Sequence, residues 1–500
     1  MSSDPIFARD PLAVRRAGVL LHPTSLPGPG AAGGLGDDAW RFVDFLCDGG
    51  FTVWQTLPLG PVDSHGSPYC ARSSYAGEPR LIDTRRLAAL GDLPRAMSFD
   101  AVGTSPLEAY ASFCGAASER ERRRFAAFYA RRRRPLFRFA LYGLCREAGG
   151  GTPWWQWPAP LRNRDPAALR RLLARKRTLF RALIFEQYAF HLLWSSLKAY
   201  ANARGVLLCG DLPFYMDLDS VDVWWERELF RLDADGKPLA VAGVPPDYFN
   251  EEGQLWGNPL YDWEAMRAKG YDWWIRRFES QLERFDMLRI DHFRALDSYW
   301  EIPAGAETAR EGHWRRGYGA ELLARLQQRL GRVPLVAEDL GIITDDVRAL
   351  RDRFGLPGMA VLQFAFDGKD DNPHLPRNQR RNEVVYTGTH DNDTTVGWYL
   401  EQDERTKRRV AEQLGLDAVR VPDDLVEAAY ASPAALAVIP MQDLMALGSA
   451  ARMNTPGSAG GNWGWRFRWD EVDAGIAPTA WERAERHGRL ARRDTESMRS

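Results

Sequence analysis

Short apolar runs rich in β-branched residues recur along the chain, and helix-like hydrophobic spacing separates most of them. The runs cover residues 18–23, 51–58, 205–215, 287–293, 333–341, 359–366, 383–391 and 436–444. Strands that alternate with helices are typical of βα units, and eight such units close into a barrel. We therefore predict an α/β fold, a (β/α)8 TIM barrel with inserted, mainly helical subdomains, that occupies residues 1–478.

Two intervals between these runs are too long for a plain connection. Residues 60–204 contain Arg-rich helical patterns such as 118–134, which predict a helical insertion between the second and third strands. Residues 216–286 form a second predicted insertion, and its segment 244–263 carries Trp and Gly. This segment follows a barrel strand, where barrels place their functional loops, so we predict a substrate lid there. Residues 479–500 are predicted to be a charged C-terminal tail.

Composition narrows the possible classes of protein. Of 500 residues, 45% are hydrophobic and 27% are charged, which excludes wholesale disorder. The net charge of −1 gives no general attraction to nucleic acid or anionic membranes. Arg-rich runs at 120–124 and 131–134 are interrupted by acidic residues or separated by apolar ones, as on a solvated helix face. We expect neither nucleic acid nor a membrane as a partner.

The ends and the cysteines point to an intracellular protein. The N-terminus lacks the apolar segment of a secretory signal, and no run approaches the length of a membrane span. The cysteines are odd in number, widely spaced and without a CxxC pair, which disfavours a disulfide framework and a zinc site. They are Cys47, Cys70, Cys114, Cys145 and Cys209. We predict a cytoplasmic protein without a bound metal.

A glycine-rich loop after the first predicted strand resembles a dinucleotide-binding fingerprint. Gly28, Gly30 and Gly33 have the GxGxxG spacing and precede a predicted helix. Pro27 and Pro29 interrupt the turn, and the next predicted strand ends without an acidic residue to hold a ribose. We favour a plain connection between strand and helix, and a nucleotide-dependent enzyme remains an alternative.

Four predicted strands end in a carboxylate. These residues are Asp211, Asp291, Glu338 and Asp391, and in a barrel the carboxyl ends of the strands converge on one cleft. A single Asp at such a junction could merely cap a helix. Four of them at strand ends, spread over some 180 residues, favour a shared chemical role. Arg289 lies two residues before Asp291, so both side chains share one face of the strand.

The surroundings of two carboxylates suggest different protonation. Arg289 should lower the pKa of Asp291 and keep it ionised. Glu338 follows an apolar run, which should raise its pKa and let it donate a proton. A nucleophile paired with a general acid/base is the machinery of retaining glycoside cleavage. That chemistry requires no cofactor, and we predict none.

At these residues the chain closely resembles the amylomaltase family of 4-α-glucanotransferases (disproportionating enzymes). The resemblance extends over about residues 18–470 and indicates the short form of the family. It rests on segments in the family's order: GVLLHPTSLPGPG (18–30), SPYCARSSYAGEPRLID (67–83), GDLPFY (210–215), GQLWGNPLYDW (253–263), RIDHFRAL (289–296), VAEDLGIIT (336–344), LPGMAVLQFAFDG (356–368), YTGTHDNDT (386–394) and ARMNTPG…NWGWRF (451–467).

The resemblance implies a role for each matching residue. Asp291 is expected to be the nucleophile, Glu338 the acid/base, and Asp391 the third acid, which hydrogen-bonds sugar hydroxyls. The expected substrate contacts are Tyr69, Asp211, Gln254, Trp256, Arg289, Phe364, His390 and Asn462. The partners it implies are an α-1,4-glucan donor and a glucose or maltooligosaccharide acceptor. We expect a monomer or a small homo-oligomer.

Some alternatives stay open. His390 could cap its loop, Trp256 could pack within the lid, and Asn462 with Trp463 could only tie the C-terminal segment to the barrel. Glu78 and Arg377 depart from the family pattern as we read it, which puts local loop geometry in doubt. An α-glucan hydrolase with the same carboxylates is the first alternative function, and a non-catalytic glucan-binding barrel is the second.

Overall fold

The computed structural model describes residues 10–28, 30, 32–63, 65–94, 105–246, 251–458 and 460–490. Each of the eight apolar runs overlaps one strand of a parallel sheet, in the order β10-β11-β12-β1-β2-β3-β6-β9. The strands are β1 (Arg16–Leu20), β2 (Val53–Gln55), β3 (Leu207–Leu212), β6 (Met287–Ile290), β9 (Leu335–Ala337), β10 (Gly358–Val361), β11 (Glu383–Tyr386) and β12 (Leu436–Pro440). The predicted eight-stranded barrel is confirmed.

The two end strands of this sheet, β9 and β10, meet and nearly close the barrel. The N–H of Ala337, the last residue of β9, donates to the carbonyl of Pro357 just before β10 (2.8 Å). The strands are buried on both faces, which explains why each appears in the sequence as a continuous apolar run.

Helices surround the barrel and form the segment between β2 and β3. The segment contains α2 (Thr84–Ala89), α3 (Pro106–Ala116), α4 (Glu119–Arg131), α5 (Arg133–Ala148), α6 (Ala159–Arg162), α7 (Pro166–Arg175) and α8 (Arg177–Ala203). The others are α1 (Asp37–Asp48), α9 (Val221–Trp225), α10 (Trp263–Ala268), α11 (Asp272–Arg284), α12 (Gly319–Leu330), α13 (Asp345–Arg353), α14 (Thr395–Glu401), α15 (Glu404–Leu414), α16 (Asp423–Ala431), α17 (Met441–Leu444) and α18 (Ile476–Arg486). No helix among the described residues is long and apolar enough to cross a membrane.

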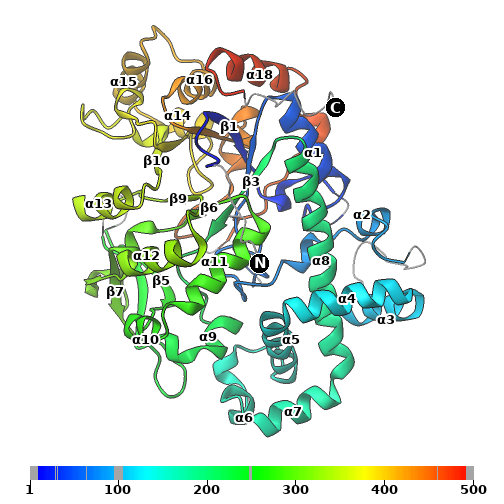
Figure 1. Cartoon of the computed structure of the whole chain (residues 1–500). Coiled ribbons are helices and arrows are strands. Elements are labelled where there is room, and N and C mark those ends of the chain that lie inside the picture. Colours follow the sequence, from blue (N-terminus) through cyan, green and yellow to red (C-terminus); the bar gives the residue numbers. More distant parts are fainter. Residues whose placement is uncertain are drawn as a thin grey trace.

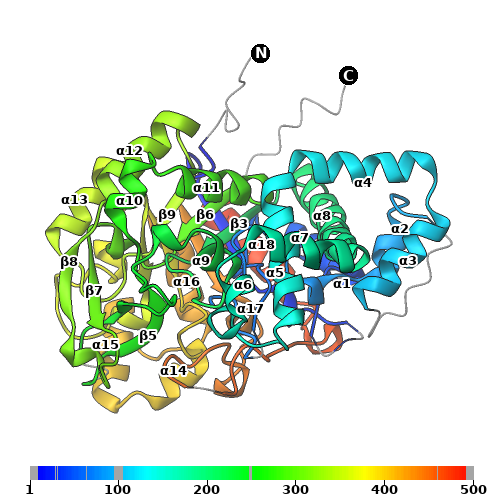
Figure 2. The ribbon, with the colours of Figure 1, turned by 90° about the horizontal axis from the view of Figure 1, so that it is seen from below.

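The segment between β2 and β3 is helical, as its pattern predicted, although its exact limits as a domain stay a prediction. Two of its helices begin with capping boxes, in which Ser105 and Ser118 exchange hydrogen bonds with Glu108 and Glu121. Helices α3 and α4 lie on the side of the molecule opposite β7 in both views (Figures 1 and 2).

A small antiparallel sheet was not predicted from the sequence. It consists of β5 (Gln254–Pro259), β4 (Ala240–Val244), β7 (Ser298–Pro303) and β8 (His313–Arg316), in that order. Strand β8 is exposed along its whole length, and in β5 only the last residue is buried, so neither shows the hydrophobic alternation of a half-buried strand. Strand β5 lies in the predicted lid, of which residues 247–250 are outside the described part of the chain.

One arginine joins the first and last strands of the barrel. Arg489 is fully buried, and its guanidinium donates to the carbonyls of Arg16 (2.9 Å), Tyr430 (2.8 Å) and Ala434 (3.1 Å). Arg16 begins β1, and Ala434 lies just before β12. The guanidinium therefore ties these strand ends together while meeting its own need for hydrogen-bond acceptors. Residues 491–500 of the predicted tail are outside the described residues.

The glycine-rich loop after β1 is held by an arginine from the C-terminal part of the chain. Arg466 donates to the carbonyls of Gly30 (2.7 Å) and Gly28 (2.9 Å). A Cβ on Gly33 would lie 2.3 Å from the carbonyl oxygen of Leu26, so close backbone packing explains this glycine. This geometry fits the plain connection that we favoured. Pro29 lies outside the described residues.

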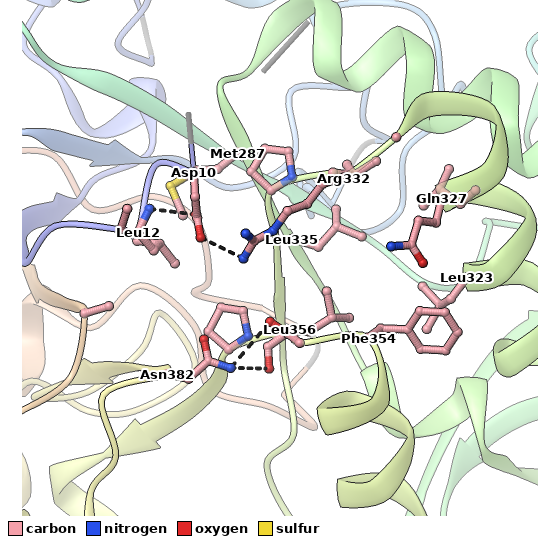
Figure 3. Close-up of a pocket in the computed structure, with 18 of the residues that line it drawn as sticks. Asp10, Leu12, Met287, Leu323, Gln327, Arg332, Leu335, Phe354, Leu356 and Asn382 are labelled. Atoms are coloured by element: carbon pink, nitrogen blue, oxygen red, sulfur yellow. Dashed lines mark hydrogen bonds and ion pairs between the residues drawn. The ribbon is translucent and has the colours of Figure 1, made fainter. Parts of the chain in front are cut away.

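A cavity of about 320 Å³ opens at the end of the barrel where the strands begin. Met287 and Leu335, the first residues of β6 and β9, line it, and Arg332 pairs with Asp10 at 2.7 Å beside them (Figure 3). None of the predicted site residues lines this cavity. The carboxylates lie at the opposite ends of these strands, where barrel enzymes carry their chemistry.

Candidate active site

The four predicted carboxylates lie at the carboxyl ends of barrel strands. Asp211 lies near the end of β3, and Asp291 and Glu338 directly follow β6 and β9. Asp391 lies in the loop after β11, and Arg289 lies within β6. Asp211 pairs with Arg289 in the register of β3 and β6, which places their side chains on one face of the sheet.

Arg289 connects two of these carboxylates. Its Nη1 lies 2.5 Å from Asp211 Oδ2 and 3.1 Å from Asp291 Oδ1, and its side chain is almost fully buried. The hydroxyl of Tyr69 donates to Asp211 Oδ2 at 2.7 Å and lies 2.8 Å from His390 Nε2. The rings of Tyr69 and His390 are stacked, with centroids 5.3 Å apart. Residues that follow or end the strands β3, β6 and β11 thus form one hydrogen-bonded cluster with Tyr69 from the long connection after β2.

Glu338 is held by two backbone groups. Its Oε2 accepts a hydrogen bond from the N–H of His292 (2.7 Å), and its Oε1 accepts one from the N–H of Leu340 (2.9 Å). His292 has a left-handed backbone, with φ of 50°, and directly follows Asp291. Its ring meets the ring of Trp256 edge to face, with centroids 4.9 Å apart. His292 therefore contacts both the acid/base candidate and the predicted lid.

Asp391 is oriented by the C-terminal segment. Asn454 Nδ2 donates to Asp391 Oδ1 at 2.6 Å, and Arg452 donates to its backbone carbonyl at 2.8 Å. Its other carboxylate oxygen, Oδ2, lies 3.4 Å from His390 Nε2. Sequence reasoning missed Asn454, although the segment 451–457 that contains it was one of the family-like motifs.

Arg289 lowers the pKa of Asp291, as expected, but burial outweighs this effect and, together with the surrounding carboxylates, raises the pKa overall. Sequence alone does not show this burial, because several elements contribute to it. Burial also raises the pKa of Glu338, against the effects of Arg289 and of its two backbone hydrogen bonds. Burial lowers the pKa of His390, which favours its neutral form.

The remaining predicted substrate contacts, Gln254, Trp256, Phe364 and Asn462, come from three segments. Gln254 and Trp256 lie on β5, where the Trp256 indole N–H donates to Gln254 Oε1 (3.0 Å). Phe364 ends the short helix η7 (Leu362–Phe364), and its ring meets His374 edge to face. Both Trp256 and Phe364 are more than a third exposed.

Asn462 is not brought into contact with the cluster. Its side chain accepts from the N–H of Thr455 (2.9 Å) and donates to the carbonyl of Ser458 (3.1 Å), within its own loop. The next residue, Trp463, reaches the cluster instead, with its ring centroid 6.0 Å from that of Tyr69 and 6.2 Å from that of His390. The role of Asn462 in substrate binding stays a prediction.

The two departures from the family pattern have structural partners. Glu78 is buried, and its side chain accepts from the N–H groups of Val62 (2.8 Å) and Arg80 (2.9 Å). Arg377 pairs with Asp370 at 2.7 Å. No group of His, Cys, Asp and Glu side chains in the described part of the chain is arranged to hold a metal ion.

Comparison with known proteins relates this geometry to a family. Residues 21–471 match the model of glycoside hydrolase family 77, described as 4-alpha-glucanotransferase. The chain belongs to this family. A family 77 relative, the 4-alpha-glucanotransferase of Thermus thermophilus, is 47% identical over 477 residues, which cover 91% of this chain and 95% of the relative. That of Synechocystis is 45% identical over 479 residues, which cover 92% and 95%.

Solved structures of family 77 agree. The amylomaltase from Streptococcus agalactiae in complex with acarbose matches with a TM-score of 0.90 and 33% identity, over 95% of this chain and 99% of that one. The amylomaltase from Corynebacterium glutamicum, 17% identical with a TM-score of 0.73, covers 95% of this chain and 75% of its own and shows the same fold. The family predicted from the motifs is confirmed, and this family 77 chain is a 4-alpha-glucanotransferase.

Proposed function

We propose that Asp291 and Glu338 perform the glucan transfer, as nucleophile and acid/base. The observation that carries this assignment is the position of His292. Its N–H binds Glu338, and the residue before it, Asp291, pairs with Arg289. The end of one strand thus carries one carboxyl group and orients the other, which gives a retaining mechanism its two participants.

In the first step Glu338 protonates the glycosidic oxygen and Asp291 attacks the anomeric carbon. The bond between that carbon and the oxygen breaks, and the shorter glucan leaves with the proton. Asp291 forms an ester with the remaining glucosyl unit. The attacking carboxylate has to be ionised, and Arg289, at 3.1 Å, favours the ionised form of Asp291 against the effect of burial. We assign the proton shared by these coupled carboxyl groups to Glu338.

In the second step the ionised Glu338 takes the proton from the 4-hydroxyl of an acceptor. The hydroxyl oxygen attacks the anomeric carbon, the ester bond breaks and Asp291 leaves as a carboxylate. Two inversions give net retention, and Glu338 again holds a proton. Transfer is completed when an acceptor sugar, and not water, occupies the position of the leaving glucan.

The remaining residues bind sugar in this proposal. Asp391 hydrogen-bonds hydroxyls of the cleaved glucose unit, with Asn454 and His390 fixing its carboxylate. Tyr69 and Asp211 support the same subsite through the cluster around Arg289. The more distant contacts are Gln254, Trp256, Phe364 and Asn462.

The proposed donor is an α-1,4-glucan, and the proposed acceptor is glucose or a maltooligosaccharide. The acarbose complex of the relative from Streptococcus agalactiae supports a glucan-like ligand. We place the enzyme in the cytoplasm, the reducing compartment that the wide spacing and odd number of its cysteines favour.

Incubation with maltotriose alone tests the proposal. We expect glucose and a ladder of longer maltooligosaccharides with no net gain in reducing ends, since transfer conserves the number of glycosidic bonds. The Asp291→Asn variant should be inert under the same conditions. Shorter sugars with rising reducing ends would favour the hydrolase, and bound but unreacted maltotriose would favour a glucan-binding protein.

A further inference from the structure

Among the described residues, four Trp and Phe residues stand out as exposed. Trp256 is 38% exposed and Phe364 is 37% exposed, and both are proposed sugar contacts. The other two are Trp314 on β8, 39% exposed, and Trp481 on α18, 36% exposed. A single exposed aromatic is ordinary in a protein surface. The surroundings and position of Trp314 set it apart.

The ring of Trp314 is held in place on one side. The guanidinium carbon of Arg294 lies 3.8 Å from its ring centroid. Trp300, its partner in the register of β7 and β8, meets it edge to face with centroids 5.0 Å apart. A ring fixed in this way loses little conformational freedom when a ligand stacks on its exposed part, so it forms a ready platform.

Arg294 also locates Trp314 beside the active site. It lies three residues after Asp291, in the short helix η5 (Phe293–Leu296), and is buried. Its guanidinium donates to the carbonyl of Ile342, four residues after Glu338. The same arginine therefore contacts the Trp314 ring and both chain segments that carry the proposed reacting carboxyl groups. The side chain of Ile342 is 53% exposed.

We propose that Trp314, with Ile342 nearby, forms an outer subsite for the α-1,4-glucan chain. Glucose rings have an apolar face that stacks on an indole, and Ile342 extends the apolar surface. The inference rests on the proposed assignment of the active site. Strands β5 and β8, which carry Trp256 and Trp314, are the two edges of the small sheet, so this sheet would present aromatic contacts at both edges (Figure 2).

Donors of different length can distinguish this subsite from those next to the reacting carboxyl groups. Maltotriose occupies the contacts next to the reacting carboxyl groups, whereas a long glucan extends to Trp314. With glucose as acceptor, we expect Trp314→Ala to raise the KM for amylose about tenfold, which is about 1.4 kcal/mol. The kcat/KM for maltotriose should change less than about twofold. Trp314→Phe, which keeps an aromatic face, should restore most of the affinity for amylose.

A matched control uses Trp481→Ala, which removes a similarly exposed indole from α18. This variant should leave the KM for amylose and the kcat/KM for maltotriose unchanged. Ile342→Ala leaves Arg294 and the Trp314 ring in place, and a smaller rise in the KM for amylose is expected even where Trp314→Ala fails to fold. If Trp314→Ala lowered kcat/KM equally for amylose and maltotriose, or left the KM for amylose unchanged, the proposed subsite would be overturned. Failure of the unmodified enzyme to disproportionate maltotriose would instead overturn the proposed function.

Discussion

The backbone N–H of His292 donates a 2.7 Å hydrogen bond to Oε2 of Glu338. This bond depends on the left-handed backbone of His292, with φ of 50°, a conformation that costs a non-glycine residue about 1–2 kcal/mol. The chain thus turns immediately after Asp291 and directs its next N–H toward the proposed acid/base. A single peptide unit joins Asp291 to the N–H that binds Glu338, so movement of either carboxyl group would displace the other.

Replacing Asp291 with Asn should abolish transfer while sparing the fold. Loss of the nucleophile is expected to lower kcat by about 10⁴-fold or more, measured by resolving the products from maltotriose. Because the folded protein raises the pKa of Asp291, it binds more protons than the unfolded chain above about pH 4. Stability from this group is therefore present at low pH and lost as the pH rises.

The Asn variant cannot titrate, so its thermal midpoint should exceed that of the unmodified enzyme at pH 7 more than at pH 4. If the difference in thermal midpoint between the variant and the unmodified enzyme were smaller at pH 7 than at pH 4, the raised pKa of Asp291 would be contradicted. Circular dichroism at both pH values provides the measurement.

Replacing Glu338 with Gln should remove proton donation and leave the nucleophile intact. Transfer from maltotriose is expected to fall by about 10²–10⁴-fold, the usual contribution of a general acid/base. An α-glucosyl fluoride needs little protonation to leave, so it should still form the ester with Asp291. Mass spectrometry should then detect the protein with one added glucosyl unit, and no such adduct in the variant would assign Glu338 a different role.

Replacing Arg289 with Lys should move the acid limb of the pH profile. Arg289 lowers the pKa of Asp291, and a shorter ammonium group cannot keep contacts with both Asp211 and Asp291. The pKa of Asp291 should rise further, so a higher pH is needed to ionise the nucleophile. The acid limb of kcat/KM should shift to higher pH, whereas Arg332→Lys, at the other end of the barrel, should leave it in place.

Gly33 and Gly30 should respond differently to replacement by Ala. A Cβ at Gly33 would lie 2.3 Å from the Leu26 carbonyl oxygen, whereas a Cβ at Gly30 meets nothing closer than 3.3 Å. We expect Gly33→Ala to destabilise the fold by about 1–3 kcal/mol and Gly30→Ala to have a much smaller effect, measured by urea unfolding. Similar effects at both positions would show that backbone packing does not explain Gly33.

The barrel could be predicted because its parallel strands are buried on both faces and appear as apolar runs. The small sheet could not, since every residue of a strand such as His313–Arg316 is exposed and the strand carries no periodic signal. The carboxylates were found from the same topology, because Asp291 and Glu338 lie at the ends of predicted strands. The raised pKa of Glu338 was predicted from its apolar run. The overall rise in the pKa of Asp291 was not, since its burial depends on side chains from distant parts of the chain.

Other site residues reach the cluster only through tertiary packing. Trp463 contacts Tyr69 and His390 from a loop far along the chain, and Asn454 binds Asp391 from the same region. No spacing rule in the sequence relates these pairs. The motif containing Asn462 was noticed, but only the folded loop shows that its neighbour Trp463 makes the contact.

The buried guanidinium of Arg489 has a consequence for how the chain is made. Its acceptor at the start of the barrel, the carbonyl of Arg16, lies 473 residues earlier. At about 5–20 residues per second, a ribosome needs roughly half a minute or more to make that stretch. During this time the beginning of β1 has no partner for this contact. The barrel therefore reaches its final stability only after nearly the whole described chain has left the ribosome.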